Sequence, residues 1–108
     1  QAGAARAVIA NAGNANCANG EQGMLAARAM TAAVSQVLKI PEKQVLAAST
    51  GVIGAPFPID AVEAAIPALT GQLNVNGVPD LARAIMTTDT RPKTAIAKIA
   101  AFGTCYKE

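Results

Sequence analysis

The sequence of 108 residues contains no histidine. A Ser-His or Cys-His catalytic arrangement therefore cannot be built from this chain alone. Only two cysteines are present, Cys17 and Cys105, and they form no CxxC pair. Two separate thiols are favoured over a disulfide, and no metal site or bound cofactor is expected. If the chain takes part in catalysis, the proton acceptor must come from elsewhere.

Charged and aromatic residues are also scarce, at 15% and 3% of the chain. Nine basic and seven acidic residues give a net charge of +2 and form no basic run. A nucleic-acid-binding surface needs a positive stripe, often with stacking aromatics, so nucleic acid is not an expected partner. An ordinary soluble domain is roughly 25% charged. This composition favours a surface that is partly covered by another polypeptide over a compact alanine-rich domain with small side chains outside.

Long hydrophobic runs are missing as well. No apolar stretch approaches the length that spans a bilayer, and the first ten residues lack the basic and apolar regions of a signal peptide. We therefore expect no membrane partner and a cytoplasmic location. The length fits one small domain, so residues 1–108 are predicted to form a single α/β domain.

The pattern of apolar residues predicts alternating strands and helices. Short buried strands are expected at 6–10 and 45–49, with a third strand at 93–102. A helix should begin after Asn19, where Gln22 has the spacing of a capping box. A second helix should begin at Asp60 and be kinked or shortened by a proline at position 67, and a third should run from 79 to 86. The order β-α-β-α-α-β predicts a layered sheet-and-helix fold of the α/β class.

Three connections are rich in small polar residues, and these are Asn11–Asn19, Thr50–Gly54 and Thr87–Thr90. The pattern alone favours ordinary turns in each case. Thr50–Gly54 lacks the Lys-Ser/Thr ending of a phosphate loop. An oxyanion hole is the more attractive functional interpretation, because a Thr hydroxyl adjoins a Gly N–H that no side chain shields.

Two further residues, Cys17 and Asp89, are of types that can carry chemistry. Cys17 lies near a predicted helix start, where the helix field lowers the pKa of a thiol, but it has no basic neighbour in the sequence. A small buried thiol is the favoured interpretation. Asp89 is the only acid within a polar loop of unclear purpose, and a turn or capping role is favoured for it.

Three segments together resemble the ornithine acetyltransferase (glutamate N-acetyltransferase) family. They are Val8–Asn16 (VIANAGNAN) with the helix start that follows, Val45–Gly54 (VLAASTGVIG) and Met86–Lys93 (MTTDTRPK). They occur in the family's order and account for the chain as far as Lys93. Nothing is transferred onto the remaining residues, which match poorly.

The resemblance implies an enzyme made as one precursor that cleaves itself into α and β chains. The new N-terminal threonine of the β chain is then the nucleophile. It takes an acetyl group from N-acetylornithine, and the acetyl-enzyme passes this group to glutamate in a ping-pong reaction. Acetyl-CoA is a further candidate donor. The implied architecture is a two-chain fold of the N-terminal-nucleophile type, and the implied partners are the β chain and further αβ pairs in a higher oligomer.

The resemblance also assigns site residues. Thr50 and Gly51 match the oxyanion-hole pair, and Thr87 matches a threonine that contacts substrate, although Thr88 next to it leaves this register open by one position. The family's Lys-Gly-x-Gly-Met segment, its Ala-Thr cleavage site and its nucleophile are not in this sequence. We therefore expect an incomplete portion of the α chain that is inactive alone. A free α-amine can act as the base for an N-terminal threonine, which agrees with the absence of histidine.

Two other functions remain open at this stage. One is a non-catalytic interaction domain with an apolar docking face, which would have no need of the Thr50-Gly51 pair. The other is a paralogous acetyltransferase of the same mechanism in a specialised pathway. No residue of the sequence distinguishes the donor or acceptor amino acid.

Overall fold

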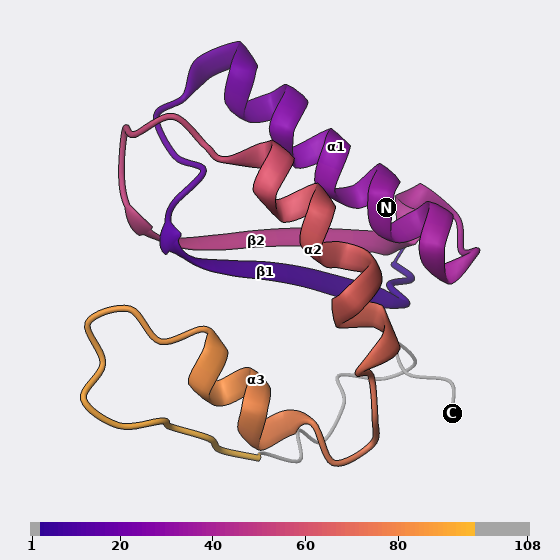
Figure 1. The fold of residues 1–108 in the computed structure, drawn as a ribbon, viewed down its shortest axis with the longest axis vertical. Coiled ribbons are helices and arrows are strands. Elements are labelled where there is room, and N and C mark those ends of the chain that lie inside the picture. The colour runs from indigo at the N-terminus through magenta and orange to yellow at the C-terminus, as the bar shows by residue number, and fades with distance from the viewer. Residues whose placement is uncertain (1–2, 97–108) are drawn as a thin grey trace.

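The computed structural model describes residues 3–96 of the chain. In chain order its elements are β1 (Ala7–Asn14), α1 (Gly20–Leu38), the 3₁₀ turn η1 (Glu42–Gln44), β2 (Val45–Val52), α2 (Ile59–Gly71) and α3 (Val78–Ala84). Figure 1 shows α1 and α2 side by side over the two strands, with α3 apart from them below the sheet. The predicted layered α/β fold is confirmed.

The two strands are parallel, and both are longer than predicted. Their register runs from Ala7 opposite Val45 to Asn14 opposite Val52. The predictions that 11–19 is entirely a loop and that Thr50-Gly51 begins a turn were therefore wrong. The polar ends of the strands stay extended because each pairs with the other, which neither segment reveals alone.

The hydrophobic core lies between the sheet and the two long helices. Its buried residues are Ile9, Met30, Val34, Val45 and Ile66. Met30 and Val34 are four positions apart, so they lie on the same face of α1. The apolar periodicity that predicted this helix therefore marks the face that packs on the sheet and α2.

Details at the helix ends differ from the expectations. Asn19 occupies the N-cap position of α1, but it makes no side-chain capping bond and instead donates from Nδ2 to Asn16 Oδ1 at 3.3 Å. Pro58, not Asp60, precedes α2, and Asp60 lies in its first turn, where negative charge is favourable. The capping-box prediction and the Asp60 cap were therefore wrong.

The interior of α2 and the end of the chain also depart from the predictions. The helix is not cut short at Pro67 and continues to Gly71, with the completely buried Ile66 holding this part of the helix on the core. The helix predicted at 79–86 is confirmed as α3, which begins one residue earlier, at Val78, and ends at Ala84. Residues 93–96 are not a strand, and the rest of the predicted third strand lies outside the described residues.

Candidate active site

Two segments run side by side at the carboxyl end of the parallel sheet, the end at which α/β folds bind ligands. One follows β1 and the other is the end of β2 with the loop after it. The backbone bonds that join them are Ala15 N–H to Val52 O at 2.9 Å and Gly54 N–H to Cys17 O at 3.1 Å. These bonds make one rigid unit of two segments that lie almost forty residues apart in the sequence.

Two glycines face each other where these segments meet. Gly13 has φ +107° and Gly51 has φ +131°, and they are partners in the sheet register. A Cβ atom on Gly51 would lie 2.4 Å from the carbonyl carbon of Gly13 and 2.7 Å from the backbone nitrogen of Asn14. Only glycine fits here, because the backbone of β1 occupies the space that a side chain would need.

Thr50 lies immediately before this close approach, opposite Ala12. It is half-buried, and among the described residues no hydrogen bond engages its hydroxyl. A hydroxyl that no described residue engages, on a strand held by its neighbours, can donate to a ligand. The structure thus keeps Thr50 and Gly51 adjacent on a rigid strand end, which is the kind of support that an oxyanion hole requires.

Asparagine side chains brace the same region. Asn11 Nδ2 donates to the Asn14 carbonyl at 2.8 Å, and Asn14 Nδ2 donates to the Pro56 carbonyl at 3.0 Å. Asn16 Nδ2 donates to the Gly23 carbonyl at 2.7 Å and so joins the loop to α1. In the described part of the chain, the Oδ1 atoms of Asn11 and Asn14 are buried and have no hydrogen-bond partner. The sequence signal for this region was the repeated asparagine, but it did not reveal which groups the amides hold.

Sequence reasoning missed Ser49. Its Oγ accepts a hydrogen bond from the backbone N–H of Asn16 at 2.8 Å. Ser49 directly precedes Thr50, and this position was the only signal in the sequence that could have drawn attention to it.

The structure does not bring Thr87 together with the Thr50-Gly51 pair. Thr87 is exposed and lies in the segment after α3, which Figure 1 draws below the sheet. Between the described residues, no hydrogen bond links Thr87 to Thr50 or Gly51. The role of Thr87 therefore stays a prediction.

Asp89 lies close by in this segment. The ammonium of Lys93 donates a hydrogen bond to the Asp89 carboxylate and, with the backbone N–H of Thr87, holds the pKa of this partly exposed carboxyl below its ordinary value. The bonds of Asp89 fit the turn role that the sequence favoured.

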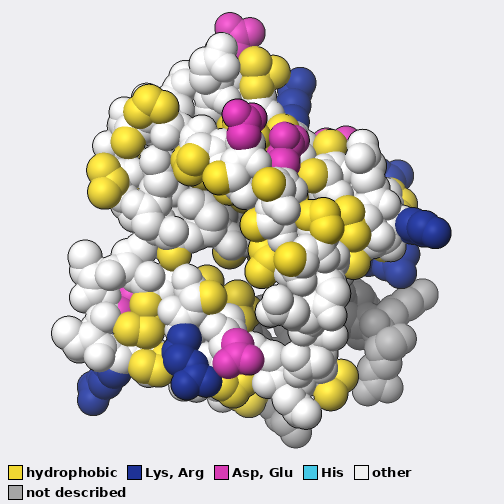
Figure 2. Space-filling view, in the orientation of Figure 1, with side chains coloured by type: hydrophobic (Ala, Val, Ile, Leu, Met, Phe, Trp, Pro, Cys, Tyr) yellow, Lys and Arg dark blue, Asp and Glu magenta, His cyan; other side chains and the backbone are white. Residues whose placement is uncertain are grey.

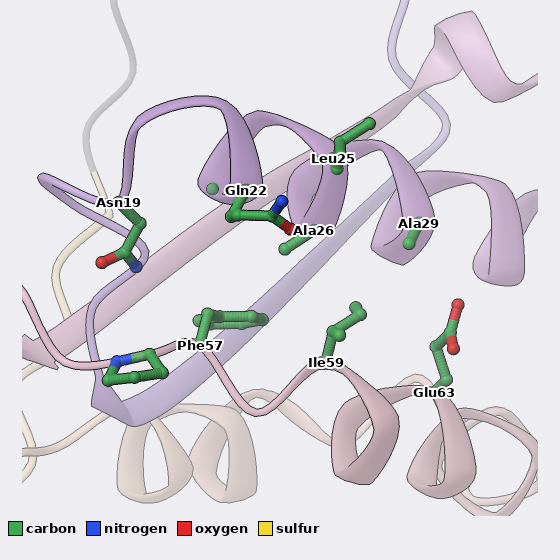
Figure 3. Close-up of a pocket in the computed structure, with 10 residues that line it drawn as sticks. Asn19, Gln22, Leu25, Ala26, Ala29, Phe57, Ile59 and Glu63 are labelled. Atoms are coloured by element: carbon green, nitrogen blue, oxygen red, sulfur yellow. The ribbon is translucent and has the colours of Figure 1, made fainter.

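A separate groove of about 540 Å³ lies between α1 and α2 (Figure 3). Its lining is mainly apolar, with polar side chains from Asn19, Gln22 and Glu63. None of the predicted site residues lines it.

Residues 3–96 contain no candidate metal site and no candidate membrane span. Within this range no three His, Cys, Asp or Glu side chains are grouped so that they could hold a metal ion. No helix in the described range is long and apolar enough to cross a membrane. Cys17 is exposed, not buried as expected, and Cys105 lies outside the described residues.

Comparison with known proteins gives consistent matches. The ArgJ family matches residues 1–107. The arginine biosynthesis bifunctional protein ArgJ of Chlorobium chlorochromatii (strain CaD3) is 52% identical over 82% of this chain, which spans 20% of that relative. The glutamate N-acetyltransferase of Methanothermobacter thermautotrophicus is 47% identical over 84% of the chain, which spans 23% of that protein.

Two solved structures share the fold. Ornithine acetyltransferase from Mycobacterium tuberculosis, complexed with ornithine, superposes with a TM-score of 0.74 at 32% identity, covering 78% of this chain and 47% of that one. ArgJ from Bacillus halodurans superposes with a TM-score of 0.69 at 36% identity, covering 78% of this chain and 44% of that one.

Proposed function

Because this chain belongs to the ArgJ family, we propose that it is part of an acetyltransferase of arginine biosynthesis that moves an acetyl group from N-acetylornithine to glutamate. The chain spans about a fifth to a quarter of the length of the curated relatives it matches. The activity is accordingly proposed for the complete protein, with this chain supplying one part of the active site.

The proposed contribution of the chain is the oxyanion hole. The observation that carries this assignment is a half-buried Thr50 hydroxyl that no described residue engages, next to a glycine that the backbone of β1 holds in place. In acyl transfer the carbonyl oxygen gains negative charge as the nucleophile attacks. Donors that are fixed beforehand stabilise this transition state more than the bound substrate.

The proposed reaction has two half-reactions. The hydroxyl of an N-terminal threonine on a separate β chain attacks the acetyl carbonyl of N-acetylornithine, while the α-amine of this threonine takes the hydroxyl proton. The tetrahedral intermediate collapses as the C–N bond breaks, ornithine leaves with that proton, and an acetyl ester remains. The amine of glutamate then attacks the ester carbonyl, and the ester C–O bond breaks as N-acetylglutamate leaves. The proton lost by the glutamate amine passes through the α-amine to the threonine oxygen, which restores the hydroxyl.

The remaining parts of the proposal concern binding. Thr87 is assigned a contact with the amino-acid substrate. Acetyl-CoA is retained as a second candidate donor, and no bound cofactor is invoked. The partner of this chain is the β chain of the same precursor, in a cytoplasmic assembly of several αβ pairs.

An assay of the complete protein tests this function. Supplied with N-acetylornithine and glutamate, it should release ornithine and form N-acetylglutamate in equal amounts, and the isolated 108-residue chain should do neither. N-terminal sequencing of the active preparation should find a second polypeptide that begins with threonine. Turnover by the isolated chain, or no transfer by the complete protein, would contradict the proposal.

A further inference from the structure

Ser49 joins the end of β2 to residues 15–19, the loop between β1 and α1, which we call the asparagine loop. The Asn16 backbone N–H donates to Ser49 Oγ at 2.8 Å in a partly buried position. Asn16 is itself fixed, because its side chain donates to the Gly23 carbonyl at 2.7 Å and receives a hydrogen bond from Asn19 Nδ2 at 3.3 Å. Ser49 is thus tied through Asn16 to the first turns of α1.

This connection lies one residue from the proposed oxyanion pair. Successive side chains of a strand point to opposite faces, so Ser49 can face the loop while Thr50 faces away from it. Gly51, which follows Thr50, lies against its partner strand β1, where the backbone of Gly13 and Asn14 leaves no room for a Cβ atom. The strand end is therefore held on both sides of Thr50 in the sequence, by the asparagine loop at Ser49 and by β1 at Gly51.

From this geometry we propose that Ser49 is a positioning residue whose bond to Asn16 holds Thr50 and Gly51 in place for the developing oxyanion. The proposal rests on the function proposed above. Ser49 touches no reacting atom in this scheme and acts only through its two neighbours in the sequence. Without its hydroxyl, the Asn16 N–H loses its partner and the loop can move away from the strand.

Such a movement should affect the transition state more than the bound substrate. Catalytic groups must be held within about 0.5 Å of the productive geometry, and a displacement of about 1 Å can cost on the order of 10² in rate. Since the strand end remains paired through the Ala15-Val52 bond, the displacement after Ser49→Ala should be partial. We expect kcat to fall about tenfold with KM changed less than about twofold.

The experiment uses the complete, cleaved enzyme with N-acetylornithine and glutamate. Ser49→Ala should show this selective loss in kcat, whereas Ser49→Thr, which keeps an oxygen at the same position, should stay within about threefold of the parent. Ser35→Ala is the matched control, because the Ser35 hydroxyl likewise makes one side-chain hydrogen bond to the backbone, donating to the Ile40 carbonyl at 2.6 Å, near the other end of α1. Its kcat should equal that of the parent even if its thermal stability falls as much as that of Ser49→Ala.

A double variant shows whether Ser49 acts through the oxyanion pair. In the Thr50→Ala background, adding Ser49→Ala should cost less than about threefold in kcat, because coupled residues lose their effects together. If both Ser49 variants are equally slow, if the two losses multiply independently, or if Ser49→Ala keeps full kcat, the positioning role is wrong. If Thr50→Ala itself keeps full kcat, the oxyanion assignment fails, and this outcome is distinct from a failure of Ser49 alone.

Discussion

At the scale of single residues, Thr50 carries the most direct prediction. Its hydroxyl has no partner among the described residues and lies at the carboxyl end of the sheet. Thr50→Ala in the complete enzyme should lower kcat by about 10²–10³ with little change in KM, as expected for the loss of one oxyanion donor. Steady-state kinetics on fully cleaved protein measure this. A kcat within about threefold of the parent would remove Thr50 from the oxyanion hole.

Gly51 tests the close approach of the two strands. Gly51→Ala places a Cβ 2.4 Å from the Gly13 carbonyl carbon, in a backbone with φ +131°. Gly54→Ala is the matched control, because Gly54 also has positive φ, +80°, but nothing lies within 4 Å of its Cβ position. Both variants bear a conformational cost of about 1–3 kcal/mol, and the clash should destabilise Gly51→Ala by about 1–3 kcal/mol more.

Unfolding by denaturant measures the difference between these two glycine variants. Equal free energies of unfolding would show that the strands can separate at Gly13 without cost. The crowded contact would then be no constraint on the candidate site.

Thr87 is a substrate contact only by family resemblance, and the structure leaves its side chain exposed. If Thr87 binds the amino-acid substrate in the complete enzyme, Thr87→Val should lower kcat/KM by roughly tenfold to more than a hundredfold, the effect of an unpaired polar group that costs about 1–3 kcal/mol. Thr88→Val is the matched control, since it makes the same change one position along. A loss in Thr88→Val alone would shift the assignment by one residue.

At the scale of elements, the contact of α1 with the sheet and α2 should hold the domain together. Met30 on α1 is 1% exposed within the core, whereas Met24 on the same helix is 58% exposed. Met30→Ala should therefore cost about 2–5 kcal/mol of unfolding free energy, and Met24→Ala less than about 0.5 kcal/mol. Thermal and denaturant unfolding of the complete protein check this, and equal effects of the two substitutions would contradict the described core.

The helices were predictable because their signal is local. Apolar residues at helical spacing identified α1, and a proline in the first turn identified the start of α3. Only the apolar first part of each strand was predictable, because Asn11–Asn14 and Thr50-Gly51 have the composition of turns. These segments stay extended because each is the other's partner across the sheet. A single segment of sequence does not show which distant segment it pairs with.

The candidate site also has features that the sequence could show and features that depend on contacts between distant segments. The sequence could single out Thr50 and Gly51, since a hydroxyl and an unshielded N–H are visible in the residue types themselves. It could not identify Ser49, because the group that Ser49 binds belongs to Asn16 on another segment. The reason for glycine at 51 was hidden as well, because the atoms that exclude a side chain belong to residues 13 and 14.

At the scale of the whole molecule, the low content of charged residues is accompanied by many exposed apolar side chains. Figure 2 shows hydrophobic side chains exposed over the helical layer as well as over α3. Val8 and Val52 on the strands are 65% and 64% exposed, and Leu73 after α2 is 69% exposed. Scattered apolar side chains are normal on soluble proteins, but many large ones on a small domain are typical of a protein-contact surface. This agrees with the covered surface that the composition favoured.

The exposed apolar side chains should determine how the isolated chain behaves in solution. Expressed alone, the 108-residue chain should self-associate or bind a hydrophobic dye, because large apolar side chains such as Val8 and Val52 are mostly exposed on the strands of the described residues. The complete protein at the same molar concentration should bind much less dye, since the remaining polypeptide is expected to cover these residues. Dye fluorescence and light scattering over a concentration series compare the two. A chain that stays monomeric, unfolds cooperatively and binds no dye at high concentration would show that its apolar surface needs no partner.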